Sequence, residues 1–266
     1  MPVARVRPVR EAARDGRFLK NSTRAAHTHP NMQTMHTMNE SMTVIDAIRS
    51  RRSVRAFLPD PVERSTLEAI FESACRAPSG SNIQPWKVHL LTGEVKEALS
   101  RAILDVFNDP DTDRLHEEEF AYYPQTWTSP FIDRRRKLGI GLYTLLGITR
   151  ENKEGMHTQM GRNFTFFGAP VGIIFTTDRT MQRGSWLDCG MFIQNIMLMA
   201  RAYGLDTCPQ AAFNRYHRII AERLKLPENE RVICSMSLGH ADWSQPENEL
   251  RSEREPLEGI VRFLGP

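Results

Sequence analysis

Cysteine is scarce in this sequence, and its four residues stand far apart with no C-x-x-C pair: Cys75, Cys189, Cys208 and Cys234. This pattern excludes a dense disulfide framework and gives no indication of a zinc or other metal site. It fits the reducing cytoplasm, where we expect the chain to be located. Long apolar runs are also lacking, since the longest, such as GIIF and IMLMA, are far shorter than the roughly 20 residues that span a bilayer. We therefore expect no membrane partner.

The body of the chain lacks an excess of charge of one sign. Residues 1–40 carry seven basic and three acidic side chains, a net of +4, whereas the whole chain has +3. Residues 41–266 therefore carry −1, and we expect no nucleic-acid partner.

Residues 1–40 mix scattered Arg with Pro, Thr and His and show neither helical nor strand periodicity. This composition predicts a disordered N-terminal extension, with an organelle-targeting segment or a mis-called start as the alternatives. Residues 41–266 then form the folded domain.

Periodicity predicts alternating helices and strands in that domain. Ser41 or Thr43 could cap a first helix, and STLE, with Ser65 and Glu68, has the pattern of a capping box for a second. Further helices are predicted over residues 93–107, near 132–148, and from Ser185 to a Gly204 terminator. The expected strands are WKVHLL (86–91), APVGIIFTTD (169–178) and RVICSMSLGH (231–240). This order indicates an α+β or α/β sandwich.

The stretch RRSVR, residues 51–55, concentrates positive charge just after the first predicted helix. Guanidinium groups bind phosphate oxygens in bidentate fashion and a Ser hydroxyl adds a donor, so Arg51, Arg52 and Ser53 could form a phosphate clamp. The alternative is an exposed basic helix end, which the helix dipole favours anyway. We expect Arg49, outside this motif, to face the opposite side of the helix end.

Two further polar clusters lie downstream. In APSGSNIQPW (77–86), small residues expose backbone groups, and the amides of Asn82 and Gln84 could pair with a planar ring rich in acceptors. The alternative is a plain helix-to-strand loop. In NELRSEREP, near the end of the chain, Arg251 and Arg254 stand in a polar arm, for which the alternative is a solvated surface.

In this order and at this spacing, the three clusters resemble the FMN-dependent nitroreductase family. Its members have R-R-S-x-R, then A-P-S-x-x-N-x-Q-P-W, then G-[YH] and R-x-P, matched here by RRSVR (51–55), APSGSNIQPW (77–86), LGH (238–240) and REP (254–256). The resemblance covers about residues 43–264 and is nearest to the nitrobenzoate-reductase branch. It implies an α+β fold, a nitroreductase-like α/β sandwich whose mostly antiparallel central sheet is flanked by helices, in a homodimer with swapped arms and shared FMN sites.

The resemblance also implies which residues bind FMN. Those matching the segment for the phosphate and pyrimidine edge are Arg51, Arg52, Ser53 and Arg55. The turn that reaches the flavin of the other subunit corresponds to Pro78, Ser79, Gly80 and Asn82, with Gln84 close to it. The segment whose backbone N–H faces flavin N5 corresponds to Gln210, Ala211 and Ala212, although the family has an acidic residue where Ala stands here. Arg254 matches a late phosphate-binding residue, and Arg251 is expected to replace a Lys that is Ser252 in this chain.

The implied reaction is a ping-pong reduction in which NADPH or NADH reduces FMN and a small aromatic acceptor then takes the nucleotide's place. Nitroaromatic compounds, including nitrobenzoates, are the implied acceptors, with quinones as secondary ones. No catalytic side chain is expected, because the flavin performs the chemistry. The irregular stretch 109–136 is expected to cover the site, with Tyr122, Tyr123 and Trp127 stacking on the substrate.

Two alternatives stay open. One is a reductive dehalogenase resembling iodotyrosine deiodinase, whose lid has a Glu, a Tyr four residues later and a downstream Lys. Glu119 and Tyr123 have the first spacing, but Thr144 stands where the Lys is expected. The other alternative is a flavin-binding module without turnover.

Overall fold

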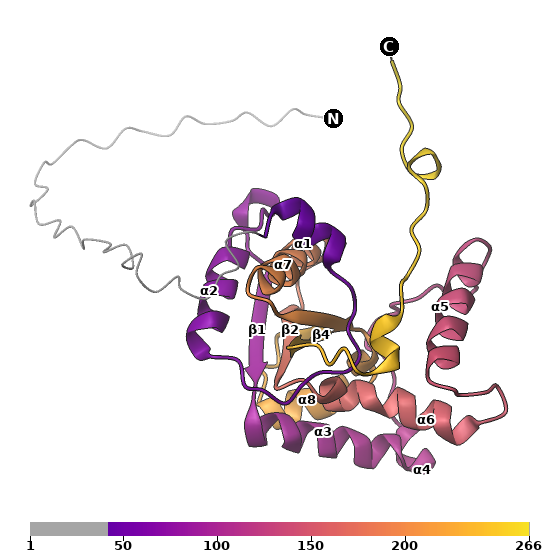
Figure 1. Ribbon diagram of the computed structural model, residues 1–266. Helices are drawn as coiled ribbons and strands as arrows, with labels where there is room; N and C mark the ends of the chain where they lie inside the picture. Colours follow the sequence, from indigo (N-terminus) through magenta and orange to yellow (C-terminus); the bar gives the residue numbers. More distant parts are fainter. Residues whose placement is uncertain (1–41, 266) are drawn as a thin grey trace, which may run out of the picture. The chain divides into compact units, whose positions relative to one another are not determined.

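A four-stranded antiparallel sheet forms the centre of the computed structural model, which describes residues 42–265 (Figure 1). Its strands follow the spatial order β1 (Trp86–Leu91), β2 (Val171–Asp178), β4 (Glu230–Gly239) and β3 (Asp206–Gln210). The described residues fall within one compact unit, Thr37–Pro266. The extension predicted over residues 1–40 lies outside them.

Three of the four strands match the sequence-based expectation closely, but β3 was not predicted. It is five residues long and contains Pro209, which lacks the N–H needed in a central strand. The structure accommodates this residue because β3 pairs only with β4 within the sheet and forms its edge. Beyond β3, Ser53 forms a parallel bridge with Thr207, so the RRSVR segment lies along this edge.

Helices cover both faces of the sheet. Helices α2 (Arg64–Ala74) and α7 (Arg183–Ala202) pack on one face, where Phe175 of β2 contacts the same core as Phe192 of α7. Helices α3 (Gly93–Phe107) and α8 (His217–Leu224) lie on the other face, with the 3-10 helix η3 (Arg162–Gly168), and Ile174 points into that core (Figure 1). Burial on both faces explains why β2 is a continuous apolar run. The expected antiparallel sheet flanked by helices is confirmed.

The helix starts agree with the sequence only in part. Thr43 caps α1 (Val44–Ser50) in a reciprocal capping box with Asp46, as expected for this position. The capping box predicted at Ser65 is wrong, because α2 begins at Arg64 and Glu68 pairs with that arginine at 2.7 Å. Helix α7 likewise begins two residues earlier than expected, although it ends before Gly204, whose φ is +70°.

The region between β1 and β2 contains more helix than its irregular sequence suggested. Helix α5 (Phe131–Leu145) was expected, whereas α4 (Pro110–Asp113) and α6 (Lys153–Gly161) were not. Helix α5 has no buried residue and lies apart from the sheet (Figure 1). The remaining short 3-10 helices are η2 (Gly80–Asn82), η4 (Ala212–Tyr216), η5 (Pro246–Glu249) and η6 (Leu257–Gly259). No helix within residues 42–265 has the length and apolar character needed to cross a membrane.

Candidate functional site

The arginines of the first and last polar clusters line one cavity of about 520 Å³, here called the arginine cavity. The end of α1 and the segment after it supply one wall, and the segment after η5 supplies another, with Gln194 of α7 between them. The lining residues with guanidinium groups are Arg49, Arg51, Arg52, Arg251 and Arg254. Contrary to expectation, Arg49 therefore lies with the others. No acidic residue of the described chain lines this cavity.

The electrostatics of the arginine cavity suit an anion. Burial lowers the pKa of Arg51, and the nearby charge of Arg254 lowers it further. Several partly buried arginines elsewhere in the described chain pair with carboxylates, for example Arg162 with Glu247 and Arg201 with Asp206. A group of guanidiniums without such partners is a strong candidate for binding a phosphate, whose double charge would offset their repulsion.

Asn248, at the C-terminal end of the chain, holds the two arginine-bearing segments together. This buried side chain accepts a hydrogen bond from Arg55 N–H at 2.8 Å and donates to the carbonyls of Ala56 and Asp242, both at 2.8 Å. Its own carbonyl accepts from the Arg52 side chain at 3.4 Å and from Arg251 at 3.3 Å. Sequence reasoning missed Asn248, because an Asn in a polar stretch gives no sign of burial.

Other members of the RRSVR segment lie beside the cavity. The Arg52 guanidinium stacks over the Trp243 ring at 4.5 Å, which restricts its orientation. Ser53 is held by its bridge to β3, and Arg55 donates to the Ser53 carbonyl at 3.2 Å. Neither Ser53 nor Arg55 is among the described lining residues.

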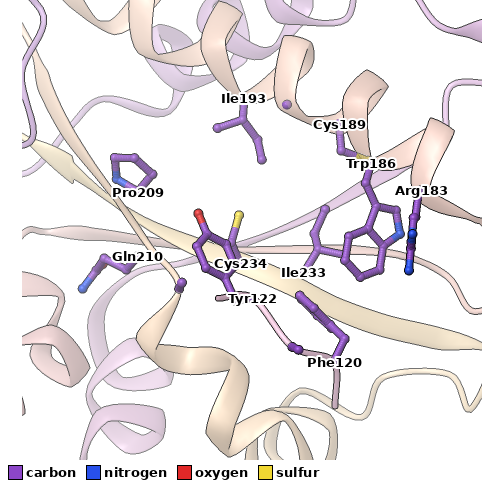
Figure 2. Close-up of a pocket in the computed structure, with 13 residues that line it drawn as sticks. Phe120, Tyr122, Arg183, Trp186, Cys189, Ile193, Pro209, Gln210, Ile233 and Cys234 are labelled. Atoms are coloured by element: carbon purple, nitrogen blue, oxygen red, sulfur yellow. The ribbon is translucent and has the colours of Figure 1, made fainter. Parts of the chain in front are cut away.

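A second cavity, of about 620 Å³, lies between α7 and the β3–β4 side of the sheet and is here called the aromatic cavity (Figure 2). One wall comes from α7, with Cys189, Gly190 and Ile193, and the floor includes Ile233 of β4. The loop before α5 closes a third side with an aromatic residue, Phe120. Burial raises the pKa of Cys189 to about 11, so this thiol is protonated at neutral pH and unsuited to nucleophilic attack.

Gln210 and Ala211 line one end of the aromatic cavity. The Gln210 side chain is buried and engaged by the protein, since its amide donates to the Asn163 carbonyl at 2.8 Å and accepts from the Ser237 hydroxyl at 2.7 Å. Over residues 42–265, no acceptor is found for the Ala211 N–H, which is therefore available to a ligand. Ala212 begins η4 directly after it and is not among the lining residues.

The PSGSN turn lines neither cavity in the single chain. Its residues are mostly exposed, and Ser81, Asn82 and Gln84 have left-handed backbones with φ of 51°, 58° and 48°. Gly80 N–H donates to Asp188 of α7 at 3.2 Å, and Gln84 N–H donates to the Ser79 hydroxyl at 3.0 Å. The turn, including Pro78, is thus held in an outward-facing conformation that is costly for non-glycine residues.

The expected substrate aromatics separate in the structure. Tyr122 lines the aromatic cavity, but neither Tyr123 nor Trp127 does. These two rings lie 5.4 Å apart, and the Arg135 guanidinium lies 4.8 Å from the Trp127 ring. The loop is anchored by Glu119, which forms ion pairs with Arg179 and with Arg231. A lid carboxylate engaged in this way is poorly suited to the ligand-binding role it has in the dehalogenase alternative.

Comparison with known proteins identifies the family. The nitroreductase family model matches residues 48–240. A 4-nitrobenzoate reductase from Pseudomonas putida is 44% identical over 218 residues, which cover 82% of this chain and 94% of that protein. A nitrobenzene nitroreductase from Ectopseudomonas oleovorans is 37% identical over 227 residues, 85% of this chain and 99% of that protein.

Among solved structures, the FMN- and NADPH-dependent nitroreductase NfnB from Sphigopyxis sp. strain HMH superposes with a TM-score of 0.81 at 35% identity. The superposition covers 84% of this chain and all of that one (100%). The resemblance inferred from RRSVR, APSGSNIQPW and REP is thereby confirmed, and the chain belongs to the nitroreductase family.

Proposed function

We propose that this protein is an enzyme that reduces nitroaromatic compounds, including nitrobenzoates, with electrons from NADPH or NADH by way of bound FMN. Related proteins with this type of activity are similar over most of their length. Quinones are proposed as secondary acceptors, and residues 41–266 as the FMN-binding domain. The proposed location is the cytoplasm.

The observation that carries this proposal is the adjacency of the two cavities along α7. Ile193 lines the aromatic cavity and the next residue, Gln194, lines the arginine cavity. A ligand with a phosphate at one end and a flat ring system at the other matches this pair, since one cavity is cationic and the other mainly apolar. FMN has these two parts, so the residues present fit it.

The roles proposed for the cavity arginines and for Ala211 follow from this placement, and those proposed for Ser53, Arg55 and Ala212 follow from the family resemblance. Arg51, Arg52, Arg251 and Arg254 neutralise the phosphate, while Ser53 and Arg55 support the adjacent part of the cofactor. The backbone N–H groups of Ala211 and Ala212 face the ring, and Gln210 sets the path of that backbone through its buried amide. Bound FMN would supply the redox chemistry, namely hydride transfer between the nicotinamide and the acceptor. Tyr122 stacks on the acceptor and helps to exclude water, with Tyr123 and Trp127 shaping the outer part of the loop.

We also propose that two chains share each FMN site in a homodimer. The outward-facing turn of Pro78, Ser79, Gly80, Asn82 and Gln84 would then complete the partner's site. Large apolar side chains are exposed on α7 and on the C-terminal arm, including Leu187 at 73% and Phe263 at 81%. Because exposed apolar surface of this kind is costly in water, a second copy of the chain is the proposed cover.

Anaerobic spectroscopy tests the proposed activity. NADPH or NADH added to the FMN-loaded protein is expected to bleach the flavin absorbance, and 4-nitrobenzoate is expected to restore it, whereas iodotyrosine is not. FMN that stays oxidised with both nucleotides would refute the enzymatic function and support a binding module. Reoxidation by iodotyrosine but not by nitroarenes would support the dehalogenase alternative, which the ion pairs of Glu119 and the Thr144 position disfavour.

A further inference from the structure

We propose that the Arg183 end of the aromatic cavity is a subsite for a carboxylate carried by the aromatic substrate. This inference rests on the proposed function and makes it more specific, because it assigns the residue that selects the carboxylated substrates among the proposed nitroaromatic ones. Arg183 is the first residue of α7 and lines the aromatic cavity together with Trp186. It lies outside every motif that the sequence pattern singled out.

Arg183 has a charge without a partner. Its side chain is exposed, and within residues 42–265 no hydrogen bond or ion pair engages its guanidinium. Arg179 and Arg231 differ from Arg183 in this respect, because both pair with Glu119 of the loop before α5. The described lining of the cavity contains no acidic residue. A lone guanidinium at the edge of an apolar cavity is suited to a bidentate contact with a carboxylate.

Trp186 adds a second unpaired donor at the same end. It follows Arg183 by three positions on α7, so the two side chains share one face of the helix. The indole Nε1 is buried and has no hydrogen-bond partner among the described residues. Its ring packs edge-on against Phe120, with centroids 4.4 Å apart. Figure 2 shows the indole beside Arg183, with the ring nitrogen on the arginine side.

The two ends of the cavity differ in chemistry. In Figure 2, Pro209 and Gln210 lie at the end opposite Arg183 and Trp186, and the side chains between them are mainly apolar. With the FMN ring at the Ala211 end, as proposed above, an aromatic substrate would lie beside that ring in the middle of the cavity, with its nitro group toward the FMN ring and its carboxylate toward Arg183. This arrangement selects nitroarenes that carry their acidic group across the ring from the nitro group. A neutral nitroarene would pack against the same apolar side chains but would lack the ionic contact with Arg183.

The test compares Arg183→Gln with wild-type holoenzyme. The substitution keeps much of the side-chain length and removes the charge at an exposed position. Binding of 4-nitrobenzoate to the oxidised holoenzyme, measured by equilibrium dialysis without nucleotide, is expected to weaken about 10- to 100-fold, as for the loss of a charge-assisted contact. The KM for 4-nitrobenzoate should rise by a similar factor, while kcat/KM for nitrobenzene should stay within about twofold of wild type.

Two controls sharpen this result. Arg183→Lys should recover part of the affinity, and Arg223→Gln, which removes an exposed arginine from α8 on the other side of the sheet, should leave binding unchanged. Equal losses for 4-nitrobenzoate and nitrobenzene, or unchanged dialysis with Arg183→Gln, would overturn the subsite. If wild-type enzyme reduced no nitroarene, the proposed function would fail, and the dialysis would still decide the subsite on its own.

Discussion

At the scale of single residues, the chemistry of the arginine cavity depends on charges that no carboxylate within residues 42–265 neutralises. Arg51 is partly buried, and its pKa is lowered by that burial and by Arg254. A buried cation beside another cation is unfavourable in the absence of an anion, so these side chains reduce stability until an anion binds. We interpret this loss of stability as a consequence of arranging the arginines in advance to bind a phosphate.

Replacing either Arg51 or Arg254 by Ala should weaken FMN binding. We expect the dissociation constant of each variant to rise about 10- to 100-fold, because each change removes a charge-assisted hydrogen bond to phosphate. Fluorescence titration of the FMN-free protein with FMN measures this, and the loss should diminish as salt is raised. Arg64→Ala, at an exposed ion pair on α2, is the control. Unchanged affinity in both variants would contradict the phosphate assignment.

The protonation of two buried thiols is also decided at the scale of single residues. Burial raises the pKa of Cys208 to about 11 and that of Cys234 to about 12. Both are therefore protonated at neutral pH, although Cys234 lines the aromatic cavity. These cysteines act as small apolar side chains.

At the scale of elements, most of the arginine cavity comes from two segments far apart in sequence, one at and after the end of α1 and the other after η5. The RRSVR segment is tied to β3 by the bridge between Ser53 and Thr207 and by the Val54 N–H donating to the Thr207 carbonyl at 3.1 Å. The C-terminal segment is tied to it by Asn248 of η5. The cavity therefore depends on how these segments join.

Asn248→Ala should separate the two segments. It leaves the Arg55 N–H without its acceptor and removes one of the two donors to each of the Ala56 and Asp242 carbonyls, so we expect the free energy of unfolding to fall by about 2–4 kcal/mol. Urea unfolding measures this, and FMN titration should show weaker binding in the same variant. The matched control is Asn229→Ala, which removes an exposed hydrogen bond to Asp178. Equal stability of the two variants would argue against a structural role for Asn248.

At the scale of the whole molecule, the described chain exposes many large apolar side chains, which are unfavourable in contact with water. They occur on α1, α5, α7 and the C-terminal arm, and include Val44 at 71% and Ile140 at 67%. Helix α5 has no buried residue although it contains Leu138, Ile140 and Leu142. Such elements are expected to gain their packing from a partner subunit.

The mass of the protein in solution and removal of the C-terminal arm test the proposed dimer. Sedimentation should give about twice the 30.5 kDa of one chain. Removing residues 257–266, which carry exposed Leu257, Ile260 and Phe263, should shift the equilibrium toward monomer and reduce FMN retention at low protein concentration. Val95→Glu on α3, on the opposite face of the sheet from α7, is the control. A wild-type monomer that retains FMN tightly would contradict the shared site.

Sequence alone determined the family, most of the elements and the identity of the main arginines. These features depend on local patterns, namely hydrophobic periodicity for β2 and α3 and short motifs for RRSVR and REP, so they can be read without knowing which segments meet. The capping box at Ser65 failed because a competing start at Arg64 was equally compatible with the same periodicity.

Only the tertiary structure decided what those elements place together. Edge strand β3, buried Asn248 and the grouping of Arg183 with Trp186 and Phe120 all result from contacts between distant segments. Whether a polar side chain is buried and paired, or left free to bind a ligand, depends on its neighbours in space. The sequence therefore indicated which class of cofactor to expect. The fold revealed the cavities that could hold this cofactor and the unpaired charge of Arg183, which could select the substrate of the enzyme.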